Sequence, residues 1–113
     1  MPYLFDPQDI AWQPHPRFDG ASVRPLITPA QNPGLTLAQV RLLPGGELPP
    51  HSHPASTETF FVLAGAVLCR VGDEERLLRR GQIGFAPPGV EHQIRNPGPE
   101  PAEALSIFNP PLP

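Results

Sequence analysis

The stretch HSHPASTETFFVLAG, residues 51–65, contains two of the chain's four histidines and the start of an apolar run. His51 and His53 stand two positions apart, so in an extended strand both side chains project to the same face, with Cβ atoms about 7 Å apart. Glu58 lies at the start of the apolar run and supplies a carboxylate. Two imidazoles and a carboxylate from one short piece of chain can bind a single metal ion.

A third imidazole comes from a second motif, GQIGFAPPGVEHQIRN, at residues 81–96. In its turn PPGVEH, proline fixes φ and Gly89 tolerates a positive φ, which returns the chain into a strand. That strand begins with His92, whose side chain shares a face with Ile94 and Asn96. The second motif therefore brings another nitrogen ligand from a different strand.

Together the two motifs resemble those of the cupins, a family of small jelly-roll barrels. The first cupin motif, G-x5-H-x-H-x4-E-x6-G, is matched in full by Gly45, His51, His53, Glu58 and Gly65. The second, G-x5-P-x-G-x2-H-x3-N, is matched in full by Gly81, Pro87, Gly89, His92 and Asn96. At roughly 5% per position, ten specified residues match a given placement by chance on the order of once in 10¹³. The short spacing of 15 residues between the motifs is similar to that of bacterial single-domain cupins.

The resemblance implies an all-β fold, a jelly-roll (cupin) β-barrel of two packed antiparallel sheets. It also implies one divalent transition metal per chain inside the barrel, and the donor set is compatible with Mn, Fe, Co, Ni, Cu or Zn. The implied metal ligands are His51, His53, Glu58 and His92. The alternative is a hydrogen-bonded polar cluster without metal, which is disfavoured because such buried polar groups carry a heavy desolvation cost without an ion.

The rest of the chain is also predicted to form strands separated by turns. Ten glycines and 19 prolines separate short apolar blocks, and no stretch has the apolar spacing of a helix. We expect a single domain over residues 1–113, with N-terminal edge strands and wrapping in 1–32 and the barrel core in 33–108. The expected core strands are Thr36 to Leu43, Thr59 to Leu63, Ala66 to Val71, Glu75 to Arg79, Gln82 to Ala86, His92 to Asn96 and Ala102 to Phe108.

Charge and cysteine content exclude several partners and compartments. The net charge is −3, and the eight arginines form no basic stripe, so we expect neither nucleic acid nor a membrane as a partner. The single cysteine, Cys69, cannot form an intramolecular disulfide. The N-terminus shows no charged leader or long apolar stretch, so the expected location is cytoplasmic.

Strand parity predicts an apolar lining around the ligands. The expected inward residues are Val40, Leu42, Phe60, Val62, Phe85 and Ile94, with Cys69 and Phe108 as further candidates. Arg41, Arg70 and Arg95 fall on the opposite parity, which counts against a phosphosugar isomerase because that enzyme needs a cationic clamp. We expect His15 to be a surface loop residue and Trp12 to cover an open end of the barrel.

Two classes of function fit this pattern, and neither identifies catalytic side chains. The leading hypothesis is a small metal-dependent enzyme, dioxygenase-like, because four ligands leave two positions of an octahedral ion open to a small organic substrate. The alternative is a non-catalytic module that binds or senses a small molecule; a sugar isomerase or epimerase ranks below both. We also expect a homodimer, because Phe61 and Leu63 form an outer apolar pair that needs a cover.

Overall fold

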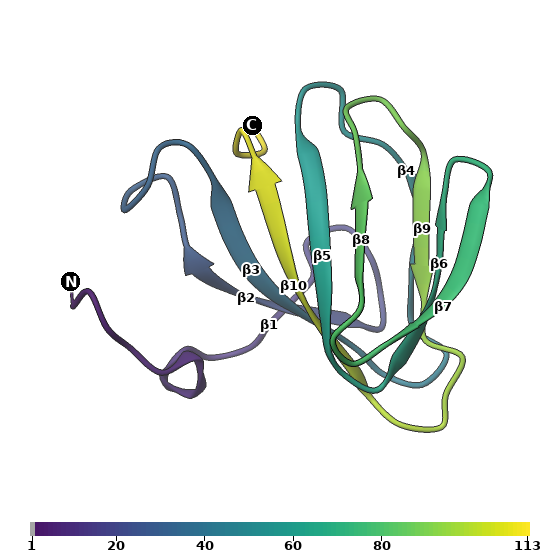
Figure 1. Ribbon diagram of the computed structural model, residues 1–113. Helices are drawn as coiled ribbons and strands as arrows, with labels where there is room; N and C mark the ends of the chain where they lie inside the picture. The colour runs from purple at the N-terminus through teal and green to yellow at the C-terminus, as the bar shows by residue number, and fades with distance from the viewer. Residues whose placement is uncertain (1) are drawn as a thin grey trace.

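Short strands separated by glycine and proline turns form two antiparallel sheets that pack face to face in the computed structural model, which describes residues 2–113 (Figure 1). The larger sheet has the order β1-β2-β3-β10-β5-β8, and the smaller one β4-β9-β6-β7. The strands are β1 (Gln13–Pro14), β2 (Ala21–Ile27), β3 (Thr36–Leu42), β4 (Glu47–His51), β5 (Thr57–Ala64), β6 (Ala66–Val71), β7 (Glu74–Arg79), β8 (Ile83–Ala86), β9 (His92–Arg95) and β10 (Ala102–Asn109).

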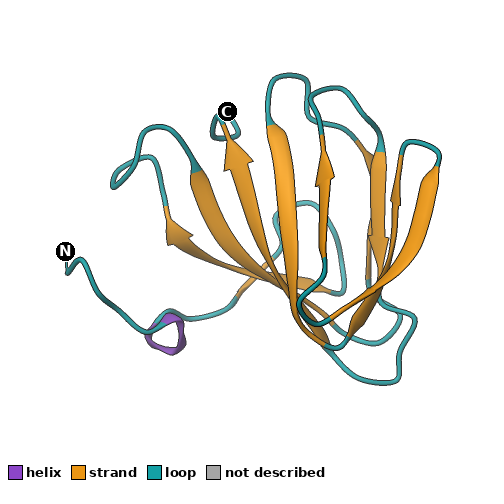
Figure 2. Ribbon diagram, in the orientation of Figure 1, coloured by secondary structure: helices purple, strands orange, loops and turns teal. Residues whose placement is uncertain are grey.

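Helical structure within residues 2–113 is limited to one 3-10 turn, η1 (Pro7–Asp9), which Figure 2 shows in purple beside a barrel made of strands. The expected all-β jelly-roll of two packed antiparallel sheets is therefore confirmed. No helix in this part of the chain is long and apolar enough to cross a membrane.

The core lies between the two sheets and follows the alternation of the strands. On β5, Phe60 and Val62 are 1% and 0% exposed. They pack in one cluster with Val67 and Cys69 of β6 and with Ile94 of β9. Burial of a large apolar side chain contributes about 1.5–3 kcal/mol, so this cluster accounts for much of the folding free energy.

Two glycines make the close approaches on which the barrel depends. Gly65 turns the chain from β5 to β6 with a φ of 70°, and a Cβ there would lie 2.6 Å from the Pro101 carbonyl oxygen. Gly84 on β8 faces inward, where a Cβ would overlap the ring of Phe60. Larger residues are therefore excluded at both positions.

Two strands contain prolines that interrupt their apolar pattern. β2 lies in the segment expected to hold edge strands and wrapping, but it is inside the larger sheet, and β4 lies in a stretch expected to form a turn. β2 contains Pro25 and has a register shift between Pro25 and Ile27. β4 contains two prolines, forms the edge of the smaller sheet and changes register between Leu48 and His51. Proline has no N–H to donate to a neighbouring strand, so within sheets it is tolerated mainly at edges and bulges. Its presence in β2 and β4 interrupts the apolar alternation by which a strand is recognised in the sequence.

The N-terminal segment packs on the outer face of the larger sheet. The Arg24 guanidinium lies 4.3 Å from the centre of the Trp12 ring, and Arg24 Nε donates a hydrogen bond to Gln39 Oε1 at 2.9 Å. Arg24 and Gln39 point away from the barrel, since the alternate residues of β3, such as Val40, face the core. The expectation that Trp12 covers an open barrel end is therefore wrong: a cation–π contact holds it over the sheet face.

Candidate metal centre

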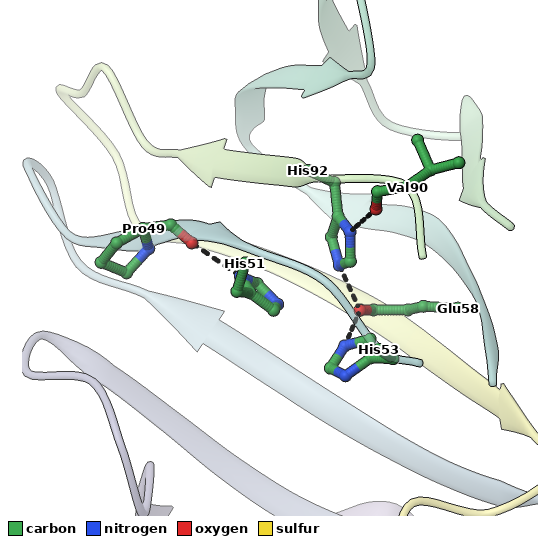
Figure 3. Close-up of polar contacts among 6 residues, drawn as sticks. All are labelled: Pro49, His51, His53, Glu58, Val90 and His92. Atoms are coloured by element: carbon green, nitrogen blue, oxygen red, sulfur yellow. Dashed lines mark hydrogen bonds and ion pairs between the residues drawn. The ribbon is translucent and has the colours of Figure 1, made fainter. Parts of the chain in front are cut away.

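Four donor side chains from the two motifs meet between the sheets. His51 ends β4, Glu58 is the second residue of β5, His92 begins β9, and His53 lies in the loop after β4. One ligand atom from each of these residues lies within 4.8 Å of the other three (Figure 3). The cluster therefore links both sheets of the barrel and could hold a metal ion.

The two histidines of the first motif do not share a strand, contrary to the expectation from their spacing. β4 ends at His51, and the chain leaves the ladder before His53. The loop nevertheless places the two ring centres 5.1 Å apart. The Gly89 N–H, from the turn of the second motif, donates a 2.8 Å hydrogen bond to the His53 carbonyl oxygen and so joins the motifs through the backbone.

Backbone carbonyls set the orientation of two of the imidazoles. His51 Nδ1 lies 2.6 Å from the Pro49 carbonyl oxygen, and His92 Nδ1 lies 3.0 Å from that of Val90 (Figure 3). A carbonyl oxygen only accepts, so each Nδ1 carries a proton and donates it. This leaves both Nε2 atoms for the cluster, the arrangement by which proteins fix the tautomer of a ligating histidine.

Glu58 is the buried negative charge of the cluster. Its carboxylate Oε1 lies 3.2 Å from His53 Nε2 and 3.0 Å from His92 Nε2. Burial raises the pKa of Glu58, but the hydrogen bonds from these two histidines outweigh it and bring the pKa down to about 2. Burial lowers the pKa of His92, yet its contact with Glu58 outweighs burial and raises that pKa overall. Burial lowers the pKa of His51.

The donor chemistry fits a divalent transition metal. Because His92 Nδ1–H is committed to Val90, its Nε2 faces the Glu58 carboxylate either with a second proton or with a lone pair that needs a cation beside it. Three imidazoles and one carboxylate are a borderline donor set of the kind that binds Mn, Fe, Co, Ni, Cu or Zn. A shared cation would satisfy every inward donor of the cluster.

Asn96, the last residue of the second motif, braces the far end of β9. Its side-chain nitrogen donates to the carbonyl oxygens of Leu42 (2.9 Å) and Glu100 (2.8 Å), and its Oδ1 accepts from Gly98 N at 2.8 Å. Asn96 is 1% exposed, and both its side-chain nitrogen and its side-chain oxygen form hydrogen bonds within the protein. Asn96 therefore supports the strand that carries His92 and takes no direct part in the donor cluster.

A cleft opens between β7 and β8, the edge strands of the two sheets, which do not pair with each other. Its volume is about 380 Å³, near the lower end of the ~300–1,000 Å³ range of small-molecule sites. Phe60, Cys69 and Val90 are among its lining residues, and Glu74 and Arg76 of β7 contribute charge. The lining includes none of the four donor residues, although Val90 accepts the hydrogen bond of His92.

Phe85 lines the cleft between β7 and β8, but it does not face the barrel interior as the expected lining required. Phe60, Val62 and Ile94 lie in the core, and Val40 packs against it, but the Phe85 side chain is 60% exposed. β8 pairs Ala86 with Glu58 and Gly84 with Phe60, so Ala86 and Gly84 take the inward positions. The prediction that Phe85 faces the barrel interior is wrong because the small residue of this strand, Gly84, lies over the Phe60 ring.

Three other expected members of the lining differ in their roles. Leu42 is 3% exposed and belongs to the core. Phe108 of β10 packs edge-on against His53, with ring centres 5.4 Å apart. Cys69 is 5% exposed, and burial raises the pKa of its thiol to about 12, so it is a neutral core residue.

The loop between β1 and β2 adds residues that the sequence pattern did not connect with the cluster. The Phe18 ring centre lies 5.4 Å from that of His51 and 4.9 Å from that of His15. His15 is half-buried rather than a free surface residue. No sequence motif identifies this loop. The loop approaches His51 only because β2 pairs with β3, and such a contact between distant parts of the chain leaves no local pattern in the sequence.

The comparisons with known proteins agree with this geometry. The Cupin domain family matches residues 38–108. Germin-like protein 5-1 of Oryza sativa subsp. japonica is 39% identical over 104 residues, which cover 82% of this chain but only 45% of that protein. The structure of TT1209 from Thermus thermophilus is 30% identical, with a TM-score of 0.80 and coverage of 96% of this chain and 97% of its own.

A further match covers part of a larger protein. A structure of oxalate oxidase is 31% identical, with a TM-score of 0.71, and the match covers 80% of this chain and 51% of that one. The chain thus spans about half the length of both the germin-like protein and the oxalate oxidase. On the strength of the matched domain and the shared fold, the chain belongs to the cupin family.

Proposed function

We propose that the chain is a small metal-dependent enzyme, dioxygenase-like, which uses one divalent transition metal bound by His51, His53, Glu58 and His92. The observation that carries this proposal is the convergence of the four donor atoms within 4.8 Å. The substrate is a small organic molecule with oxygen donors. The similarity to an oxalate oxidase supports oxidative chemistry on a small organic acid at this cluster.

The side chains around the cluster perform binding and orientation. The carbonyls of Pro49 and Val90 hold two imidazoles in the ligating tautomer, and the Glu58 carboxylate supplies one negative charge. Phe108 packs edge-on against His53 and so places apolar surface beside the cluster. A bound metal would supply open positions for oxygen-donor ligands and, when it is redox-active, electron exchange with dioxygen.

Two measurements test this function. Elemental analysis of the purified protein should find about one transition-metal ion per chain. Metal-free protein loaded with Fe(II), Mn(II) or Cu(II) should then consume oxygen in the presence of an enediol, a catechol, a β-diketone or oxalate, followed with an oxygen electrode. Uptake that requires both metal and substrate and is lost in His51→Ala supports the proposal. Ligand binding without uptake for any metal would leave a binding or sensing module instead.

A homodimer is part of the same proposal. Phe61 is 36% exposed, and its outward neighbours on β8, Ile83 and Phe85, are 58% and 60% exposed. Leu63, the other residue expected in this surface, is half-buried. An exposed apolar patch on a sheet face is typical of an interaction surface. Sedimentation at micromolar concentration should give a dimer that Phe61→Glu converts to a monomer; a monomeric parent protein would remove the argument.

A further inference from the structure

The β1–β2 loop, residues 15–20, is a folded cap beside the donor cluster. His15 N–H donates to the Ala21 carbonyl oxygen at 3.0 Å, which closes the base of the loop. The backbone N–H groups of Arg17 and Phe18 both donate to His15 Nδ1, at 3.0 and 3.2 Å. The Phe18 ring reaches into the barrel and packs against the core. The position of the loop can be followed from the label β1 in Figure 1.

Two groups that bind anions surround the Phe18 ring. The His15 ring stacks on it, with ring centres 4.9 Å apart and planes at 25°, and the Arg17 guanidinium lies 4.9 Å from its centre. The same ring lies 5.4 Å from His51, a proposed metal ligand. The Phe18 ring therefore contacts the imidazole, the guanidinium and a proposed metal ligand.

Both groups have hydrogen-bond donors to spare. Because His15 Nδ1 accepts two backbone hydrogen bonds, the ring is neutral and carries its proton on Nε2. None of the hydrogen bonds within residues 2–113 uses that Nε2–H, and none of the three ion pairs in this range involves Arg17. Asp19, the acidic residue of the loop, is exposed, and none of these three ion pairs joins it to Arg17.

We propose that His15 and Arg17 form the recognition site for the carboxylate of a small hydroxy or oxo acid whose other oxygen binds the metal. The proposal rests on the proposed metal site. Guanidinium and imidazole N–H groups are suitable donors for a carboxylate, and a charge-assisted pair is stronger than a neutral one. Arg70, an arginine on a strand, is not available to bind a substrate carboxylate, because it is paired with Glu91 at 2.9 Å.

The test compares a charged ligand with its neutral analogue on Co(II)-loaded protein. Isothermal titration measures the dissociation constants of L-lactate and L-lactamide, which differ in the carboxylate alone. The metal itself favours lactate, so the informative quantity is the change in the lactate/lactamide preference between variants. Arg17→Gln should lower this preference about fivefold, the upper end for one exposed charge pair. Arg80→Gln, which alters an exposed arginine of the β7–β8 turn, should leave it unchanged.

A second variant separates recognition from loop structure. In His15→Asn, the side-chain oxygen can still accept from the backbone N–H groups of the loop, but the Nε2–H is gone. This variant should retain Co(II) and thermal stability while its lactate preference falls by a few fold.

Two outcomes overturn the proposal in different ways. If Co(II) is retained and both variants keep the wild-type preference, the recognition site is wrong and the metal site stands. If the wild-type protein retains no Co(II), measured by elemental analysis, the proposed metal site fails and the recognition site fails with it.

Discussion

The segment of residues 45–96 contains His51, and the N-terminal segment of residues 2–20 contacts it through Phe18, but the two segments are held in place by different contacts. The first buries alternate residues of its strands between two sheets and places every proposed metal ligand. The second lies on the surface, where Trp12 stacks on Arg24 and Phe18 alone reaches the core. Burial therefore fixes the donor cluster, whereas a few surface contacts fix the loop that caps it.

The largest expected effect comes from the core of the motif segment. Phe60→Ala removes a ring that is 1% exposed and leaves a cavity over Gly84, so the free energy of unfolding should fall by about 3–5 kcal/mol in urea titrations. Leu43→Ala is the control, since this apolar side chain is 53% exposed and lies outside the proposed dimer surface; it should cost less than about 1 kcal/mol. Equal losses would contradict the burial of Phe60 in the core.

Acid should destabilise the metal-free protein through Glu58. The carboxyl has a pKa of 4.5 when unperturbed and about 2 in the folded chain, so the unfolded state binds the proton first. The resulting stability, on the order of 3 kcal/mol, is present above pH 4.5 and is lost as the pH falls toward 2. Urea titrations between pH 6 and pH 2.5 measure it, and Glu58→Gln should flatten this acid limb.

The histidines act in a separate pH range. The raised pKa of His92 stabilises the metal-free fold below pH 6.5, and that contribution is lost as the pH rises through the folded value. The lowered pKa of His51 acts in the opposite sense: its contribution is present above pH 6.5 and is lost as the pH falls. Burial also lowers the pKa of His15, which acts in the same sense as that of His51, so the difference between the parent protein and Glu58→Gln is what isolates the Glu58 contribution. An acid limb unchanged in Glu58→Gln would contradict the pairing of this carboxylate.

Metal affinity should separate His92 from His15, the histidine outside the motifs. His92→Gln removes a ligand held by Val90 and should weaken metal binding by about a hundredfold or more, since the loss of an outer partner alone costs ~10–100-fold. His15→Asn should change metal affinity by less than about threefold. Competition with a chromophoric chelator measures both constants. A comparable loss in the two variants would place His15 among the ligands.

The donor cluster was predictable from sequence because it depends on residue type and spacing. The ten motif positions identified the family, and the donor residues meet in space as that identification implied. Strand parity correctly placed Phe60 and Ile94 in the core. It failed at Phe85, because a four-residue strand with an inward glycine offers no apolar alternation from which the inward face can be recognised.

The N-terminal segment was not predictable in the same way. β2 is a seven-residue strand, but Arg24 and Pro25 interrupt its apolar pattern, and Arg24 is buried only because Trp12 and Gln39 cover it. The approach of Phe18 to His51 joins residues 33 positions apart across different elements. Contacts of this kind follow from the assembled sheets and leave no local periodicity in the sequence.

The smallest expected effect tests how firmly the N-terminal segment is attached. Trp12→Ala removes the aromatic partner of Arg24 and should lower the free energy of unfolding by about 1 kcal/mol, the scale of a partly desolvated cation–π contact. Gln8→Ala, in the exposed 3-10 turn, should have no measurable effect. Because β1 leads directly into the loop of His15, hydrogen exchange at the Arg17 and Phe18 amides should quicken in Trp12→Ala while exchange in β5 stays unchanged. Faster exchange in both regions would mean that the N-terminal segment is part of the same cooperative unit as the barrel core, and the contrast between the two segments would fail.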